Sequence, residues 1–291
     1  MEFSADLIAN ALIAGLLLGG FYAAMSLGLT ISFGLLDVVN IAHPAFILTG
    51  SYIAYAMNSA FGMDPIVAGF VTSPLAFIAG FLLYHYYRWY FERSGEDSLR
   101  GLAFFFGLML VMEVSLILIF GVDYRTVQTA YQDATPTIGA LSFPLRMLIP
   151  FCVSVLLVAL VQLVLSLTFF GRTVQAVSQD RIALQLMAGD PIRIKAIAFG
   201  VSVALATIAG SLLIVIQPVE PSIMWLYVGV PFAICVLGGL GSISGMLVAA
   251  LLLGVAESLT SVFWGPSWSP ALAFGVLLLV IGFKPAGLFG R

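Results

Sequence analysis

Residues 171–195 read GRTVQAVSQDRIALQLMAGDPIRIK and separate two long apolar runs at about 147–170 and 196–217. The charged residues of this insert are Arg172, Asp180, Arg181, Asp190, Arg193 and Lys195. A stretch this polar cannot lie in the hydrocarbon of a membrane, and basic loops stay on the cytoplasmic side. The flanking runs therefore predict transmembrane helices, and the insert predicts a structured cytoplasmic loop that docks a partner.

The chain as a whole is too apolar for a soluble protein. Of its 291 residues, 62% are hydrophobic and 9% are charged, whereas about 25% of the residues of ordinary soluble domains are charged. This composition predicts an all-α polytopic membrane protein. We expect a single transmembrane domain over residues 1–291, with about eight to ten helices of roughly 20 residues each, some of them broken or re-entrant. The basic residues form no dense patch, which argues against a nucleic-acid partner.

Hydrophilic joints divide the chain into nine apolar segments. These segments fall at about 7–33, 41–61, 65–87, 102–122, 147–170, 196–217, 223–237, 245–264 and 270–283. If they cross the membrane in alternation, the basic clusters at 88–100, 171–195 and 284–291 all lie on one face. The positive-inside rule then predicts an N-terminus outside and a cytoplasmic C-terminus. The first segment predicts a retained helix, because no Lys or Arg precedes it as in a signal peptide.

Two stretches of polar residues, glycine and proline interrupt the apolar sequence, at Gly34–Pro44 and at Gly238–Gly245. Irregular backbone at membrane depth is tolerated only where protein or a water-filled cavity satisfies its polar groups. A pair of such interruptions, one in each half, points to a transport pathway. The candidate pathway residues are Asp37, Asn40, His43, Gly238, Gly239, Gly241 and Ser242. Two tight turns at the membrane surface are an equally good interpretation.

The first three of these candidates have a spacing of three residues. Asp37, Asn40 and His43 would share one helical face if that piece of the chain were helical. They would then line a polar path or cap the ends of a broken helix. We expect no metal site, because His43 and His85 are the two histidines of the chain and no cysteine cluster accompanies them.

The pattern of the 171–195 insert predicts two short helices joined by a turn. Val174 and Val177 share a face of the first helix, and Ile182 and Leu186 share a face of the second. Asp180 is placed to cap the second helix at its N-terminus.

The end of the insert predicts where the second short helix stops and the next span begins. Gly189 is placed to end the helix, and Asp190 and Pro191 are placed to start the following span. Leu184 and Met187 are then expected to be exposed to a partner. The predicted docking residues are Gly171, Arg172, Asp180, Arg181, Leu184, Met187 and Gly189. The alternative is a self-packed amphipathic linker that lies on the lipid headgroups.

Glu113 and Glu257 lie within apolar segments. An intramembrane acid is costly and is a candidate functional residue that faces the bundle interior. Ser258, Thr260 and Ser261 are near enough in sequence to hydrogen-bond Glu257. We favour a structural bond between helices for these acids, and the alternative is ion or proton coupling in a secondary carrier.

The sequence lacks the motifs of the common hydrolases. A Walker A loop needs Gly-Lys followed by Ser or Thr, but Lys195 follows Ile194 and Lys284 follows Phe283. No Gly-x-Ser-x-Gly element occurs either. An intramembrane Ser–His protease would have to pair Ser242 or Ser51 with His43 arbitrarily. We therefore predict no catalytic residue and no enzymatic activity in this chain.

Four passages together carry a resemblance to a known family. They are Leu27–Thr30 leading through Phe33–Gly34 to Val39–His43, Val236–Ser242 followed by Gly245, Gly171–Arg172 through Asp180 to Gly189, and Lys284–Arg291. They resemble, in the same order, the LivH-type subunit of branched-chain (hydrophobic) amino-acid ABC transporter permeases. Pro44 stands where that family usually has Gly, and Ile41 where it has Phe. Gln175 and Gln179 replace charged residues that are common in its docking loop.

The resemblance implies a permease subunit of a binding-protein-dependent importer in a prokaryotic inner membrane. Such a subunit moves branched-chain or other hydrophobic amino acids, or related molecules such as amides and urea. It pairs with a paralogous permease, receives substrate from a periplasmic or extracellular binding protein, and couples to two cytosolic ATPase subunits. ATP and Mg would bind to those ATPase subunits, and this chain would hold no cofactor. An ion- or proton-coupled secondary transporter of small solutes is the alternative.

Overall fold

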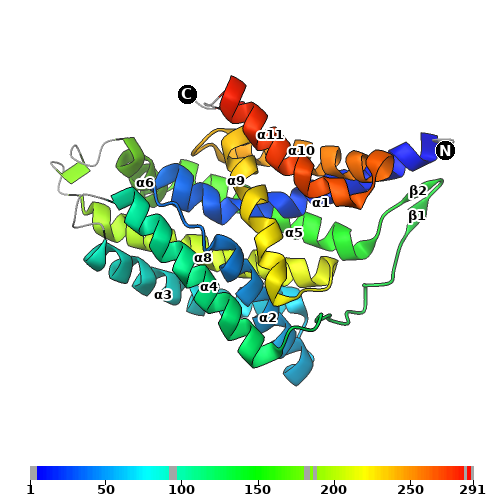
Figure 1. Cartoon of the computed structure of the whole chain (residues 1–291), viewed down its shortest axis with the longest axis horizontal. Coiled ribbons are helices and arrows are strands. Elements are labelled where there is room, and N and C mark those ends of the chain that lie inside the picture. The colour runs from blue at the N-terminus through cyan, green and yellow to red at the C-terminus, as the bar shows by residue number, and fades with distance from the viewer. Residues whose placement is uncertain (1–4, 92–96, 180–183, 186–188, 285–286, 290–291) are drawn as a thin grey trace.

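The computed structural model describes residues 5–91, 97–179, 184–185, 189–284 and 287–289, and these residues are mostly helical (Figure 1). The long helices are α1 (Ala5–Leu29), α2 (His43–Phe61), α3 (Pro65–Tyr90), α4 (Asp97–Phe120), α5 (Leu145–Leu167), α6 (Phe169–Gln179), α8 (Pro191–Ile216), α9 (Leu226–Gly238), α10 (Ile243–Trp264) and α11 (Ser269–Phe283). The shorter elements are the π-helix η1 (Thr30–Leu35), the 3-10 turns η3 (Pro221–Trp225) and η4 (Pro266–Trp268), and the hairpin of β1 (Thr137–Ile138) and β2 (Leu141–Ser142).

Eight helical segments of the described chain are long and apolar enough to cross a membrane. They coincide with eight of the nine predicted apolar segments. The ninth, predicted at 41–61, forms α2, a 19-residue helix that packs mainly on α8 and α3. The prediction of an all-α polytopic membrane protein is therefore confirmed.

Helix α8 is the central element of the bundle. It is the most deeply buried of the long helices, and α1, α2, α3 and α5 all pack against it. Small residues allow the α2–α8 crossing to be close. A Cβ atom at Gly50 would lie 2.7 Å from the Cα of Thr207, and one at Gly210 would meet the backbone of Ile47. This is how helices pack in lipid, where dispersion and hydrogen bonds replace the hydrophobic effect.

A second close crossing joins α1 to α10. A Cβ atom at Gly19 would lie 2.7 Å from the Cα of Leu251, and one at Gly254 would lie 2.5 Å from the backbone nitrogen of Gly19. Because α10 is made near the end of the chain, this crossing holds the first and last parts of the sequence together.

The two ends of the bundle differ in character (Figure 1). We call them the hairpin end, with β1, β2 and the start of α1, and the α6 end, with α6 and the C-terminal tail. Asn10 fastens α1 to the hairpin, because its side chain donates to the carbonyl of Ala140 and accepts from the backbone nitrogen of Ser142. The described chain therefore begins at one end of the bundle and finishes at the other.

Arg125 and Tyr131 attach the loop between α4 and β1 to the hairpin end. Arg125 and Val219 exchange backbone hydrogen bonds, and the guanidinium of Arg125 lies over the ring of Tyr55. Tyr131 donates to the carboxylate of Asp64 at 2.9 Å. Burial and this bond to Asp64 raise the pKa of Tyr131 above its ordinary value, so the hydroxyl stays protonated as a donor.

Candidate functional site

Helix α6 is amphipathic and lies at the α6 end beside α5, α8 and η1. Its buried residues are Gly171, Val174 and Val177, which confirms the predicted shared face of the two valines. A Cβ atom at Gly171 would come within 2.3 Å of the backbone of Leu165, so this face is in close contact with the end of α5. Arg172 lies on the opposite, exposed face. The helix therefore presents a polar surface while its apolar stripe fixes it to the bundle.

The remainder of the insert is described only in part. The predicted residues Asp180, Arg181, Ile182, Leu186 and Met187 lie outside the described residues. Leu184 is described, and the prediction that it is exposed is wrong, because only 8% of it is accessible. The backbone nitrogen of Gly189 donates to the carbonyl of Leu184 at 3.0 Å, and Gly189 also packs against the Leu184 side chain. This contact folds the leucine back onto its own loop.

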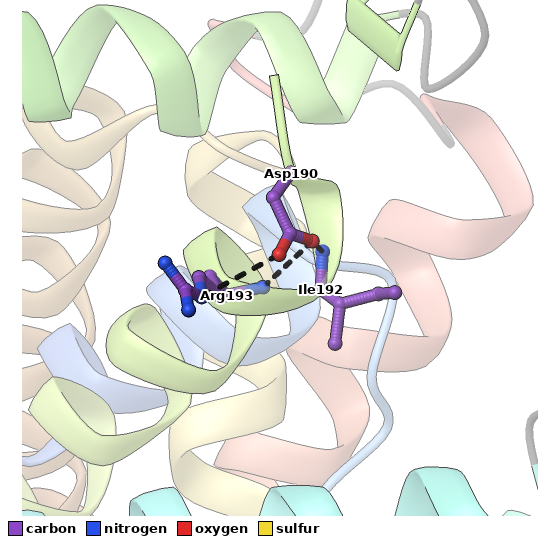
Figure 2. Close-up of polar contacts among 3 residues, drawn as sticks. All are labelled: Asp190, Ile192 and Arg193. Carbon is purple, nitrogen blue, oxygen red and sulfur yellow. Dashed lines mark hydrogen bonds and ion pairs between the residues drawn. The ribbon is translucent and has the colours of Figure 1, made fainter. Parts of the chain in front are cut away.

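Asp190 begins α8 as predicted (Figure 2). Its side chain accepts from the backbone nitrogens of Ile192 at 3.0 Å and Arg193 at 3.3 Å, and Pro191 occupies the first turn. The carboxylate also lies 3.6 Å from the guanidinium of Arg193. The ion pair is exposed and contributes little, whereas the cap satisfies amides that would otherwise lack partners.

We expect Asp190→Ala to lower the free energy of unfolding by about 1 kcal/mol, the usual cost of removing an N-terminal cap. Arg193→Ala is the matched control, since it removes the exposed ion pair and keeps the cap. Thermal unfolding of both variants in detergent checks this. Equal melting temperatures for the two variants would contradict the role of the cap.

Between η1 and α2 the first interruption is not helical, so the condition for a common helical face of Asp37, Asn40 and His43 is not met. The helix of α1 widens into the π-helix η1, and the chain then turns at Asp37, which has a positive φ of 56° and an exposed side chain. Asn40 and His43, in contrast, are fully buried. Pro44 is tolerated because it stands in the first turn of α2, where no helical donor is lost.

Helix α2 begins inside the bundle. The Nε2 atom of His43 is 2.9 Å from the carbonyl oxygen of Met25, which lies ten residues before the end of η1. Neither side-chain atom of Asn40 has a hydrogen-bond partner within the described residues. The stretch from Leu36 to Ala42 is therefore irregular backbone, in which Asn40 is enclosed by protein while Asp37 is exposed.

The second interruption is a tight turn from α9 to α10. Gly239 and Gly241 have positive φ angles of 97° and 80°, which only glycine adopts without strain. Ser242 caps α10 by accepting from the backbone nitrogen of Gly245 at 3.1 Å. Gly238 is buried against Gly245, where an added Cβ would meet backbone. The second interruption is thus a tight turn, and its depth in the membrane stays a prediction.

The two interruptions touch each other at the α6 end. A Cβ atom at Gly34 would lie 2.4 Å from the backbone nitrogen of Gly241. The C-terminal tail joins them, because Leu288 and Phe289 donate backbone bonds to the carbonyls of Leu237 and Gly238. Three of the four passages that carry the family resemblance therefore meet in space, and α6 lies beside them through its contact with η1.

The two intramembrane acids accept hydrogen bonds from aromatic side chains of other elements. Tyr22 of α1 donates to Glu257 at 2.7 Å, and the indole of Trp225 donates to Glu113 at 3.0 Å. The serine and threonine expected to serve Glu257 bond backbone carbonyls instead, Ser258 that of Ala11 and Thr260 that of Ala256. Bonds between elements, the interpretation favoured from the sequence, thus hold both acids.

Glu257 also lines a cavity of about 670 Å³ at the hairpin end. Helices α1, α5, α9 and α10 contribute to its wall, together with Gln217, which directly follows α8. Tyr22, Gln217 and Tyr227 face it together with Glu257, and the amide of Gln217 donates to the Tyr227 hydroxyl at 2.6 Å. None of these three partners stands out in the sequence, because each is a single polar residue in an apolar run.

Within the described residues, no three side chains suited to bind a metal lie together. The arrangement is instead that of a membrane bundle with an exposed amphipathic helix at one end and a polar cavity at the other.

Several known proteins are similar to this chain in sequence or in fold. Residues 11–281 match the family described as branched-chain amino acid transport system / permease component. The chain is 30% identical to the high-affinity branched-chain amino acid transport permease BraD of Pseudomonas aeruginosa, over 96% of this chain and 95% of the relative. It is 26% identical to LivH of Escherichia coli K12, over 95% and 94%. It is 27% identical to LivM of the same organism, over 92% of this chain and 67% of that one.

One solved structure has the same overall fold. It is PsaBC from Streptococcus pneumoniae in complex with Fab, with a TM-score of 0.51 and 15% sequence identity. The match covers 99% of this chain and 95% of that one. At this identity the likeness concerns the fold alone.

Proposed function

The chain belongs to the branched-chain amino acid transport system permease family, and we propose that it is the membrane-spanning subunit of an ABC importer for branched-chain or other hydrophobic amino acids. The proposal rests on the way helix α6 is held in the bundle. Its apolar face is packed on α5 and α8, and its polar face, with Arg172, is exposed at the α6 end. A helix anchored in this way suits a partner that must move the bundle.

The partners follow from what this chain does not supply. It has no Walker A sequence, so ATP and Mg bind to two separate cytosolic ATPase subunits that dock on the 171–195 loop. A second, paralogous permease completes the pathway, as the similarity to both LivH and LivM suggests. A binding protein delivers substrate from outside.

The charges of the described residues support one orientation. Arg88 ends α3 and Arg100 begins α4, and both lie with Arg172, Arg193 and Lys284 toward the α6 end. At the hairpin end, Arg125 and Arg146 are the described basic residues. By the positive-inside rule the α6 end is cytoplasmic. The described chain then begins outside and finishes in the cytoplasm.

Affinity purification of the tagged chain from its native membrane tests the assembly. Uptake of radiolabelled leucine into proteoliposomes then tests transport. We expect a second permease and ATPase subunits to copurify, and uptake to require ATP and the binding protein. Uptake that follows a proton gradient without ATP would contradict the proposal. So would a chain that purifies alone while other ABC complexes from the same membrane stay intact.

A further inference from the structure

The 670 Å³ cavity at the hairpin end has one carboxylate, Glu257, in a wall of apolar and uncharged polar residues. We propose that this cavity is a substrate site of the permease, in which Glu257 binds the ammonium group of the transported molecule. The inference rests on the proposed function and extends it, because it assigns a residue and a recognised chemical group to this chain itself.

The geometry around Glu257 holds the carboxylate in place. Tyr22 is 4% exposed and donates to one carboxylate oxygen at 2.7 Å. The bond crosses from α1 to α10 beside the close contact of Gly15 with Val255, so the two backbones that carry the pair cannot easily separate. A carboxylate held this way needs little reorganisation to meet a cation.

A second bonded pair lies on the wall of the same cavity. Gln217 ends α8 and donates its amide to the Tyr227 hydroxyl at 2.6 Å. Since that hydroxyl accepts from Gln217, its own proton is directed to another acceptor. The cavity thus offers a negative carboxylate for an ammonium and a hydroxyl donor for an oxygen of the same ligand.

The remaining wall is mixed: Asn10, Ser142, Ser258 and Ser261 line it beside an apolar part that suits an aliphatic body. Leu18, Met147, Ile223, Leu226 and Val230 line the cavity. None of the described residues that line it is Lys, Arg or His, so an anion without an ammonium finds no cationic partner there. A bond between an ammonium and a carboxylate is charge-assisted and therefore stronger than a bond between neutral groups. The chemistry therefore selects a cationic amine joined to a small apolar group, over a neutral amide or a carboxylic acid.

Glu113 provides an internal comparison. It too is an intramembrane glutamate hydrogen-bonded by an aromatic donor, but it does not line this cavity. Replacing Glu113 by a neutral residue changes the charge of the bundle by the same amount as replacing Glu257, but leaves the proposed site unaltered.

Binding to the complete permease–ATPase complex in nanodiscs, without the binding protein, tests the proposal. Isothermal titration uses three probes. Leucine has both an ammonium and a carboxylate. Isoamylamine keeps only the ammonium, and 4-methylpentanoate keeps only the carboxylate. We expect leucine and isoamylamine to bind and 4-methylpentanoate not to bind. Glu257→Gln keeps an acceptor for Tyr22 and removes the charge, so we expect isoamylamine to bind at least about tenfold more weakly.

Two further variants serve as controls. Glu113→Gln is expected to bind isoamylamine as the unaltered complex does. Tyr22→Phe keeps the carboxylate and removes its orienting bond, so we expect a smaller, severalfold loss. If Glu257→Gln fails to assemble, Tyr22→Phe still decides the matter, and unchanged binding in that variant overturns the proposal.

Other results would also overturn it. These are 4-methylpentanoate binding as tightly as isoamylamine, Glu257→Gln binding isoamylamine with unchanged affinity, and no binding of any probe to the unaltered complex. The failures are distinguishable. Amine binding without ATP-driven leucine uptake contradicts the proposed function alone. ATP-driven leucine uptake, together with isoamylamine binding that is unchanged in Glu257→Gln, contradicts this inference alone.

Discussion

Gly210→Leu is expected to abolish the folded permease. Gly210 lies on α8 where this helix crosses α2, and a Cβ atom there would come within 1.8 Å of the Ile47 carbonyl oxygen. The same atom would lie 2.8 Å from the backbone nitrogen of Ser51, whose hydroxyl donates to the Gly210 carbonyl at 2.6 Å. The obstacle is backbone on both sides, so no side-chain rotation relieves it.

The helices would have to separate, and α8 is the helix on which most of the others pack. Overpacking an ordinary core costs about 1–3 kcal/mol, and a backbone collision at the central crossing should exceed that range. The measurement is the yield of monodisperse protein after solubilisation, together with its melting temperature.

Gly107→Leu is the control for this substitution. Gly107 is also a glycine within a long helix, α4, but no described atom lies within 4 Å of a Cβ built there. We expect normal yield from this variant. A Gly210→Leu protein that is as abundant and as stable as Gly107→Leu would show that the crossing is not needed for folding.

Arg172→Glu is expected to uncouple the permease from its ATPase. Arg172 projects from the exposed face of α6, while Gly171 and Val174 hold the opposite face to the bundle. The substitution should therefore leave the fold intact and act on the docking surface. Reversing a charge within an interface costs about 2–5 kcal/mol when its partner is left unpaired. We expect ATPase affinity to fall at least about tenfold, and ATP-driven uptake to fall with it.

The measurement is copurification of the ATPase subunits, with uptake as a second readout. Arg146→Glu makes the same charge change at an exposed position on the first turn of α5, at the hairpin end. We expect that variant to retain its ATPase subunits. Full retention and unimpaired uptake in Arg172→Glu would exclude α6 as the coupling element.

Features with local causes were predictable from the sequence. Hydrocarbon sets the length of a span, so the apolar segments matched the long helices. The spacing of Val174 and Val177 gave the buried face of α6, and the Asp190–Pro191 pair gave the start of α8. In each case the determining contacts lie within one helix or its first turn.

Features that depend on distant contacts were not predictable. The common face expected for Asp37, Asn40 and His43 assumed a continuous helix, but the chain leaves the helix after η1 and is held by contacts with α1 and α8. The exposure expected for Leu184 failed because Gly189 closes over it. The partner of Glu257 is Tyr22, 235 positions away in the chain, and no local pattern identifies it.

The buried start of α2 has a consequence for biosynthesis. Asn40 and His43 are made early, but α8, which closes around this region with Ser202 bonded to the Gly28 carbonyl, emerges from the ribosome only after some 150 more residues. His43 can already bond the Met25 carbonyl of α1, but the burial of this region is completed only when α8 packs on α1 and α2. The first helices therefore reach their native packing only after the second half of the chain has been made.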